Sequence, residues 1–237
     1  MSLPEQHLLV FGASGAIGAE ICRMASDASW QVTGVSRTGI EETGRIRSIV
    51  ADPLAPGFCA EQLASQVPYT GICWAQGMNA TDSVYSVQQA KNLELYSANC
   101  LYILETLKIL LGEKLLAPGS RLCVISSIWQ NLARQNKLSY CMTKAAIQGL
   151  VLSASVDLAP EGHLINAVLP GAVDTPMTRT NLSAQQIDRM TGGTEFHRLT
   201  SLMDVASAVL YLCSPQNTGI TGQFICVDLG WSRARIV

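Results

Sequence analysis

The most constraining feature of this sequence is an alternation of short apolar runs with longer helical patterns along its whole length. Strands that are separated by helices pair in parallel, and helices cover both faces of the resulting sheet. We therefore predict an α/β fold with a doubly wound sheet of about seven parallel strands. The predicted strands are Leu8–Phe11, Gln31–Val35, Ser48–Val50, Gly71–Trp74, Arg121–Ile125, Leu164–Val168 and Gly222–Val227.

Helical patterns separate these strands. The clearest predicted helices are Ala19–Ser29, Tyr96–Leu111, Tyr140–Leu158 and Asp204–Leu212, and the stretch 53–69 holds one helix at most. No composition break, repeat or low-complexity linker interrupts the chain, so we predict a single domain over residues 1–237. Within it, residues 176–200 lack a strand pattern and predict a helical flap over a substrate, with an ordinary surface loop as the alternative.

Charge and hydropathy exclude several classes of partner. The net charge is −2 and no long basic run occurs, so we expect neither nucleic acid nor a membrane surface as a partner. The polar segment Met1–His7 precedes an apolar run of only strand length, which predicts neither a signal peptide nor a membrane span. We expect a cytoplasmic protein. Only 14% of residues are charged, which fits either surfaces covered by other subunits or simply an apolar chain.

The eight cysteines suggest neither disulfides nor a metal site. No pair has C-x-x-C spacing, and several cysteines lie inside apolar runs. Buried reduced thiols in a reducing compartment are the natural interpretation. No cluster of His and Cys has the spacing of metal ligands, so we predict no metal.

A glycine-rich segment connects the first strand to the first helix. Gly12, Gly15 and Gly18 lie between the run Leu8–Phe11 and an amphipathic helix. Gly12 would allow a tight turn, Gly15 a close approach of a ligand, and Gly18 close packing of helix on strand. A helix N-terminus attracts a pyrophosphate, so we predict a dinucleotide site of the Rossmann type here, with a ligand-free turn as the alternative. Its predicted contacts also include Ser14, Ala16 and Ile17.

The end of the second strand indicates which dinucleotide is bound. NAD would be held by an acidic residue at this position, and none is present. Ser36 and Arg37 instead offer a hydroxyl and a guanidinium, which suit the 2′-phosphate of NADP. We predict NADP rather than NAD, although Arg37 could be an ordinary surface arginine. Asp52 could bind the adenine amino group, or it could serve a turn before Pro53.

Three residues suggest acid/base chemistry. Tyr140 and Lys144 are four residues apart on a predicted helix and share one face. A neighbouring ammonium favours the phenolate form, which would let Tyr140 exchange a proton with a substrate. Ser127 follows a strand whose carboxyl end faces the ligand crevice, where a hydroxyl can bind a developing charge. Without Ser127, the Tyr-x-x-x-Lys pair would more often be a helix-surface pair, and Ser127 alone could be a helix cap.

Together these motifs resemble the short-chain dehydrogenase/reductase family in its short form. The resemblance also includes Asn99, Pro170–Thr175, Gly219–Gln223 and Val227–Gly230, and it spans nearly the whole chain in the family's order. It implies hydride transfer between a nicotinamide cofactor and a carbonyl or secondary alcohol. It also implies that Tyr140 is the general acid/base, that Ser127 polarises the carbonyl, and that Lys144 lowers the tyrosine pKa and binds ribose.

The resemblance implies further cofactor and catalytic contacts. Asn99 matches the asparagine that holds a proton-relay water, although it could also be a polar residue at a helix kink. Thr175 and the backbone of Val173 would hold the nicotinamide carboxamide. The other cofactor positions that the resemblance implies are Gly77, Pro170 and Gly171.

Two segments depart from the family pattern. Ala16 stands where the commonest short-form pattern has its middle glycine, and Gly15 supplies one a residue earlier. The fourth strand ends in Trp74-Ala75-Gln76-Gly77 instead of Asn-Asn-Ala-Gly. Gly77 is kept, but the hydrogen bonds of the missing asparagine would need a substitute, for which Gln76 is a candidate.

The family implies several partners and leaves the substrate open. We expect a homo-oligomer, a tetramer or a dimer, and a small carbonyl or alcohol substrate; a carrier-bound 3-oxoacyl group is one candidate. Arg134 and Lys137 could attract an acidic carrier, and Trp129, Met177 and Phe196 could line the substrate pocket. A nucleotide-sugar-modifying enzyme is one alternative, but few residues follow Thr175 to form its substrate domain. A non-catalytic NADP sensor or scaffold is the other, although it would need no acid/base residues.

Overall fold

Seven strands form one parallel sheet in the computed structural model, which describes residues 5–233 and omits the side chains of Met177 and Asn181. The strand order is β3-β2-β1-β4-β5-β6-β7, and every neighbouring pair is parallel. This confirms the predicted doubly wound fold. The strands are β1 (His7–Phe11), β2 (Gln31–Ser36), β3 (Ile46–Val50), β4 (Tyr69–Trp74), β5 (Leu116–Ile125), β6 (Leu164–Pro170) and β7 (Phe224–Val227).

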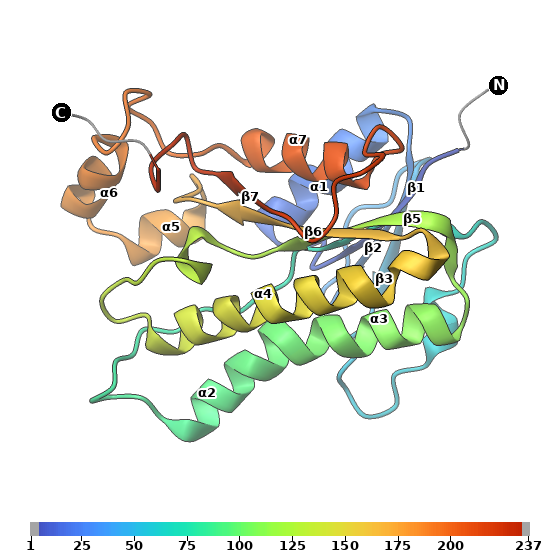
Figure 1. Cartoon of the computed structure of the whole chain (residues 1–237), viewed down its shortest axis with the longest axis horizontal. Helices are drawn as coiled ribbons and strands as arrows, with labels where there is room; N and C mark the ends of the chain where they lie inside the picture. The colour runs from blue at the N-terminus through green and yellow to red at the C-terminus, as the bar shows by residue number, and fades with distance from the viewer. Residues whose placement is uncertain (1–4, 234–237) are drawn as a thin grey trace.

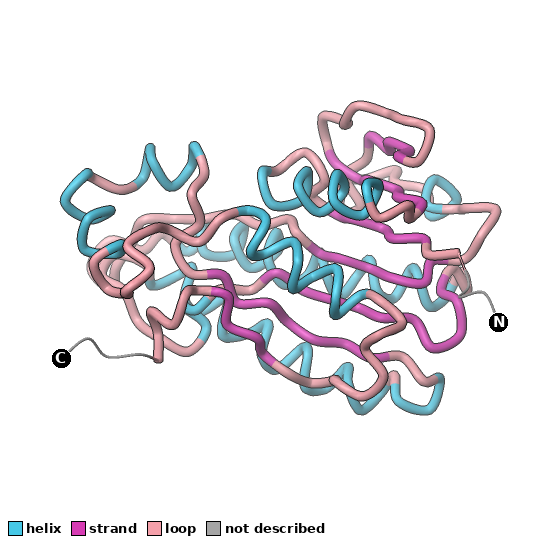
Figure 2. The backbone as a smooth tube through the Cα atoms, turned by 90° about the horizontal axis from the view of Figure 1, so that it is seen from above, coloured by secondary structure: helices cyan, strands magenta, loops and turns pink. Residues whose placement is uncertain are grey.

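Helices cover both faces of the sheet (Figure 1). One face carries α1 (Ala16–Asp27) and α7 (Leu202–Cys213), and the other carries α2 (Gln89–Tyr96), α3 (Tyr102–Gly112) and α4 (Leu138–Asp157). Two short helices, α5 (Pro176–Asn181) and α6 (Ala184–Thr191), extend beyond the carboxyl ends of the strands, which Figure 2 shows from above. They occupy the segment that was predicted as the flap.

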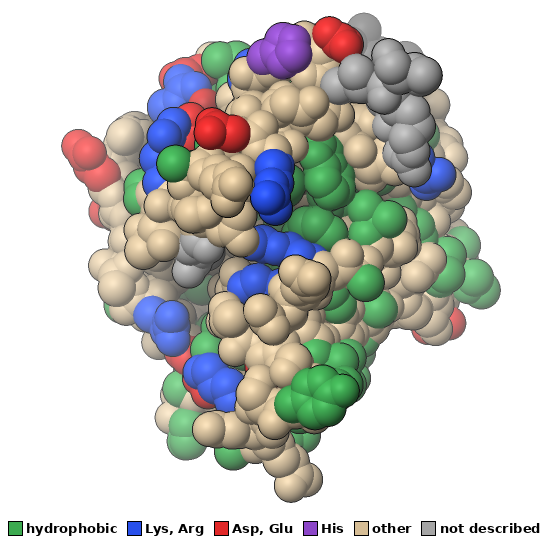
Figure 3. Space-filling model, turned by 90° about the vertical axis from the view of Figure 1, so that its left-hand side faces the viewer, with side chains coloured by type: hydrophobic (Ala, Val, Ile, Leu, Met, Phe, Trp, Pro, Cys, Tyr) green, Lys and Arg blue, Asp and Glu red, His purple; other side chains and the backbone are tan. Residues whose placement is uncertain are grey.

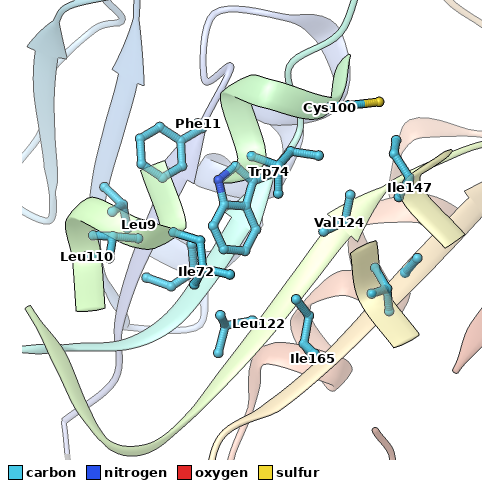
Figure 4. Close-up of a cluster of buried hydrophobic side chains, with 14 of the residues drawn as sticks. Leu9, Phe11, Ile72, Trp74, Cys100, Leu110, Leu122, Val124, Ile147 and Ile165 are labelled. Atoms are coloured by element: carbon cyan, nitrogen blue, oxygen red, sulfur yellow. The ribbon is translucent and has the colours of Figure 1, made fainter. Parts of the chain in front are cut away.

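The two faces of the sheet have separate hydrophobic cores, and β1 contributes to both. Leu8 and Val10 pack in the cluster with α1 and α7, whereas Leu9 and Phe11 pack in the cluster with α3 and α4. Because successive side chains of a strand point to opposite faces, a strand buried on both sides is a continuous apolar run. Figure 4 shows the second cluster, in which Trp74 lies among side chains of several strands and helices.

One predicted helix differs from the structure. The segment predicted as a helix over Tyr96–Leu111 begins earlier, at Gln89, and contains a π-helical turn at Ser97–Leu101 between α2 and α3. The first eight residues are mostly polar and exposed, so they lack the apolar periodicity that marks a helix in a sequence. Between β3 and β4, the only helix in the structure is the 3₁₀ turn Ala60–Leu63, in agreement with the prediction of one helix at most.

The part of the chain that the structure describes contains no helix long and apolar enough to span a membrane. Over the same residues, no three His, Cys, Asp or Glu side chains are grouped as a metal site. All eight cysteines are free thiols, and five of them are buried.

Candidate active site

A cavity of about 920 Å³ lies at the carboxyl ends of the strands, on the side of the molecule that Figure 3 shows. Its volume is suited to a cofactor together with a small substrate. Two residues predicted for the site, Gly18 and Asn99, are absent from its wall. The predicted residues that line the cavity are Gly12, Ser14, Gly15, Ala16, Ile17, Ser36, Arg37, Asp52, Gly77, Ser127, Tyr140, Lys144, Pro170, Gly171, Val173 and Thr175.

The turn between β1 and α1 is tightly packed against its neighbours. Gly12 has a φ of +76°, and its N–H donates to the Val35 carbonyl at 2.9 Å. A Cβ on Gly18 would lie 2.2 Å from the carbonyl oxygen of Gly12, so α1 can approach the turn only with glycine there. Gly18 therefore acts through packing and not as a cavity contact. No side chain caps the first turn of α1, which leaves its N–H groups available to an anion.

Buried polar atoms in this half of the cavity lack protein partners. The Ser36 hydroxyl and both polar atoms of the Gln76 carboxamide are buried without a hydrogen bond, and both residues line the cavity. A buried polar group without a hydrogen-bond partner destabilises the folded protein. The presence of these groups beside an anion-binding turn therefore favours a site for a polar ligand such as a dinucleotide. Arg37 is exposed and has no acidic partner within the described residues. Asp52 lines the cavity and also accepts from the Leu54 N–H at 3.1 Å, which is the turn role considered above.

Ser127 and Tyr140 meet in the other half of the cavity. Ser127 begins a 3₁₀ turn after β5, where its Oγ accepts from the Trp129 N–H at 3.3 Å. Its side chain lies beside the phenol of Tyr140, and the interaction between the two hydroxyls lowers the tyrosine pKa. Burial has the larger effect and raises the pKa of Tyr140 above its ordinary value of 10. The phenol therefore stays protonated at neutral pH in the protein without a ligand.

Lys144 lies one helical turn after Tyr140 and is buried. Its Nζ donates to the Ile125 carbonyl at 3.0 Å and lies 5.7 Å from the centre of the Tyr140 ring. Burial lowers its pKa from 10.5 to about 8. The expected effect of the Lys144 ammonium on the acidity of Tyr140 stays a prediction. Burial makes the charged form of Lys144 less stable, so its ammonium loses a proton more readily than an exposed lysine does.

Asn99 lies behind the cavity wall, in the π-helical turn. Its Oδ1 accepts from the Met78 N–H at 2.7 Å, and its Nδ2 donates to the Met78 carbonyl at 3.0 Å and to Thr143 Oγ1 at 2.9 Å. These bonds use the whole carboxamide. They hold the loop after β4 against α4, next to Lys144. The side chain of Asn99 is therefore placed to position other residues, and its predicted part in a proton relay stays a prediction.

Lys137 lines the cavity, as the sequence suggested, but its charge is not available to a carrier. It was expected at the site mouth, free to attract an acidic carrier, but it is buried, and its Nζ donates to Asn79 Oδ1, the Ala80 carbonyl and Thr81 Oγ1 at 2.9–3.3 Å. Its charge stabilises the loop after β4. Surface loops usually expose lysine, so the sequence held no signal for this burial.

The predicted flap forms part of the cavity wall. The N–H of Asp174 donates to the Thr200 carbonyl at 2.9 Å, which joins the two ends of the segment. Thr178, Leu182 and Met190 line the cavity, and none of them was predicted. Trp129 also lines it, whereas Phe196 does not and is 63% exposed. The side chain of Met177 lies outside the described residues.

Thr175, at the start of the flap, is already engaged by the protein. Its Oγ1 accepts from the Thr178 N–H at 3.1 Å and so caps α5. The same hydroxyl lies 3.1 Å from Thr178 Oγ1. Contact with a nicotinamide carboxamide would therefore add to, or replace, these local bonds.

Sequence comparison places the chain among known oxidoreductases. The family model described as enoyl-(acyl carrier protein) reductase matches residues 69–232. The 3-oxoacyl-[acyl-carrier-protein] reductase FabG of Rickettsia felis is 26% identical over 234 residues, which cover 94% of this chain and 95% of that protein.

Solved structures have the same fold. A short-chain dehydrogenase family protein from Francisella tularensis superimposes with a TM-score of 0.86 at 21% identity, covering 97% of this chain and 100% of the other. ElxO with NADP bound gives a TM-score of 0.81 at 20% identity, covering 96% and 98%. With the matched family model and this fold in agreement, the chain belongs to the short-chain dehydrogenase/reductase family of oxidoreductases.

Proposed function

We propose that this protein is an NADP(H)-dependent oxidoreductase that interconverts a carbonyl and a secondary alcohol. The observation that carries the proposal is that Ser127, Tyr140 and Lys144 line the same cavity as the uncapped N-terminus of α1. An acid/base group and an anion-binding turn in one cavity suit a reaction that needs both a proton and a phosphate-bearing cofactor.

Each of these three residues has a definite task in the reductive direction. When bound, the nicotinamide cofactor supplies the hydride that the carbonyl carbon accepts. Ser127 and Tyr140 donate hydrogen bonds to the carbonyl oxygen, and Tyr140 gives it the proton that completes the alcohol. The raised pKa of Tyr140 suits this donation, because the phenol is protonated before the reaction. Lys144 is within reach to restore the proton and to bind ribose, and the flap over residues 176–200 limits access of water.

Arg37 and Ser36 support NADP over NAD. Both line the cavity at the end of β2, the Ser36 hydroxyl lacks a protein partner, and no acidic residue stands beside them at that strand end. A guanidinium and a hydroxyl bind a phosphate through charge-assisted hydrogen bonds. The ElxO structure, which has NADP bound, adds support from a protein of the same fold.

Replacing Tyr140 with Phe tests the proposed function. We expect Tyr140→Phe to lower kcat for NADPH-dependent reduction of carbonyl compounds by about 10²–10⁴-fold, because the proton donor is lost. The dissociation constant of NADPH, measured by calorimetry, should change little. Tyr85→Phe is the matched control, since Tyr85 is almost fully exposed.

Two outcomes would contradict the proposal. Equal turnover of wild type and Tyr140→Phe would show that the phenol is not the acid. Tight NADPH binding with no oxidation across a broad panel of aldehydes and ketones would favour a sensor of the cofactor over an enzyme.

A further inference from the structure

One arginine in the cavity wall has no acidic partner. Arg134 lines the cavity near Ser127 and is partly buried. Within residues 5–233, no carboxylate forms an ion pair with it, and its guanidinium has no hydrogen-bond acceptor. A guanidinium presents five N–H donors in a planar arrangement that matches the two oxygens of a carboxylate. Arg134 therefore has its whole binding capacity available to a ligand.

The other cations of the cavity are committed elsewhere. Lys137 gives its three donors to the loop 79–81, and Lys144 lies beside Tyr140. Arg37 stands at the end of β2, on the side of the phosphate turn. Arg134 is thus the cation of the cavity wall that remains for a substrate.

Acidic groups near the cavity do not cancel this charge. Of the two acidic residues in the wall, Glu94 is paired with Lys91 at 2.7 Å and Asp52 follows β3. Figure 3 shows Lys and Arg side chains gathered in the middle of this face, with hydrophobic side chains beside them. The surface that an incoming substrate meets is therefore cationic and partly apolar, which attracts small organic anions.

Aromatic rings hold Arg134 in position. Its Cζ lies 5.9 Å from the centre of the Trp129 ring, and Trp129 packs edge-on against Trp231 at 5.8 Å. Trp231 in turn contacts Gly193, where an added Cβ would lie 2.5 Å from the indole nitrogen. A cation stacked on a fixed ring loses less side-chain entropy when it binds an anion.

The same tryptophan connects Arg134 to the catalytic pair. The backbone N–H of Trp129 donates to Ser127 Oγ, so the ring under the guanidinium and the hydroxyl that faces the carbonyl belong to one short turn. An anion bound at Arg134 would consequently lie in the same cavity as the carbonyl that Ser127 faces.

We propose that the substrate carries a carboxylate a few atoms from the reacting carbonyl, and that Arg134 binds that carboxylate. In the oxidative direction the substrate is the corresponding hydroxy acid. The proposal rests on the function proposed above and names the substrate class of the same site. It makes Arg134 a specificity residue, whereas Ser127 and Tyr140 act on the carbonyl.

Matched pairs of keto acids and their esters test this assignment. The probes are 4-oxopentanoate and 3-oxobutanoate, each compared with its methyl ester, with NADPH oxidation as the readout. We expect the wild type to prefer the acids, and Arg134→Gln to lower kcat/KM for them about 10- to 100-fold while changing that for the esters less than about threefold. Arg134→Lys should recover part of the loss. Lys114→Gln removes the same charge just before β5, at the amino ends of the strands and away from the cavity, and should have no effect.

Binding without turnover gives a second readout. Calorimetric titration of 4-oxopentanoate into the NADP⁺-saturated protein should show binding to the wild type that weakens with salt and is lost in Arg134→Gln. Equal affinity for acid and ester, or equal loss of both in Arg134→Gln, would overturn the assignment. If the esters are reduced well and Arg134→Gln changes nothing, this inference fails while the proposed function stands. If the acid binds through Arg134 but no carbonyl is reduced, the proposed function fails and the binding site stands.

Discussion

Among the residues proposed to be catalytic, Lys144 has the most strongly perturbed environment. Its side chain is buried, and its single hydrogen bond within the described residues goes to the Ile125 carbonyl. An ammonium needs more partners than one to offset its loss of water, and this is why burial lowers its pKa to about 8. The ligand-free protein therefore carries an unfavourable charge at neutral pH, which ribose hydroxyls would help to solvate.

This environment predicts how stability depends on pH. The unfolded chain binds a proton on Lys144 up to pH 10.5, whereas the folded protein releases it near pH 8. Between these values the unfolded state holds more protons, so the free energy of unfolding rises with pH. The contribution of Lys144 to the free energy of unfolding is fully present above pH 10.5 and is lost as pH falls through 8. It amounts to at most about 3 kcal/mol.

Urea unfolding of the ligand-free protein checks this at pH 7.5 and pH 10. The wild type should gain stability relative to Lys144→Met as pH rises, because Met cannot titrate and the other groups are common to both proteins. A difference between the two proteins that does not vary with pH would mean that Lys144 is not perturbed by burial.

Residue spacing predicted that the proposed catalytic residues lie in one cavity, but it did not predict their surroundings. Ser127, Tyr140 and Lys144 were identifiable because a strand end and one helix face each fix a side chain relative to the fold. The partners of Lys137 were not identifiable, because they come from a loop more than fifty residues earlier in the chain. The sequence only weakly indicated Arg134 as a binding residue. Whether its guanidinium is free to bind a ligand depends on which acidic residues the fold brings close to it.

The N-terminus of α4 is capped from outside the helix. Lys137 stands at the N-cap position without a side-chain cap, and the Asp82 carboxylate accepts from the Ser139 N–H at 3.0 Å and from the Ser139 hydroxyl. Asp82 follows the loop that Lys137 and Asn99 hold. A carboxylate at a helix N-terminus also interacts favourably with the helix dipole. The start of the helix that bears Tyr140 is therefore positioned by the loop after β4.

Removing this cap should affect both stability and turnover. Asp82→Ala leaves the Ser139 N–H without its acceptor, so we expect a loss of about 1–2 kcal/mol and a melting temperature lower by several degrees. We also expect kcat to fall while the KM for NADPH changes little, because Tyr140 directly follows Ser139 and the phosphate turn is remote. Asp82→Asn keeps an acceptor and should recover most of the turnover. A decrease in melting temperature without any change in kcat would limit Asp82 to a structural role.

The bounds of elements with a strong apolar pattern were predicted well, whereas the bounds of exposed, polar helices were not. Six of the seven strands were placed within two residues at each end, and β5 begins five residues earlier than predicted, at Leu116. The inner strands β1 and β4 were readily found because burial on both faces leaves a continuous apolar run. The exposed helix α2 was missed because no apolar face marks it, whereas residues 176–200 were predicted as a helical flap without bounds for its helices. A capping box at Ser183 and Gln186 starts α6, and the spacing of those two residues is a signal that could have located this helix.

Apolar side chains are exposed along α3 and α4 on one side of the molecule. Leu104 is 42% exposed, Leu152 46% and Val156 71%, and the two helices lie side by side in Figure 1. Exposed apolar patches of this kind mark interaction surfaces in water-soluble domains. They support the expectation from the sequence that the protein is a homo-oligomer, and we propose these helices as its interface.

Light scattering coupled to size exclusion tests the oligomer. The wild type should have a mass of two or four times 25.4 kDa. Burying a charge between subunits weakens their association. Leu104→Asp combined with Val156→Asp should therefore shift the measured mass toward that of a monomer. Met203→Asp, on α7 at the other face of the sheet, is the control. A wild type that elutes as a single chain at micromolar concentration would contradict the prediction.

The contact between Trp231 and Gly193 provides an intrinsic optical signal. Only four tryptophans occur in the chain, and Trp74 is fully buried away from the flap. Trp231 touches both the flap, at Gly193, and Trp129 in the cavity wall. Any displacement of residues 176–200 therefore changes the polarity around an indole that is already part of the molecule. Opening and closing can be followed by stopped-flow fluorescence in the native protein, without attaching a dye.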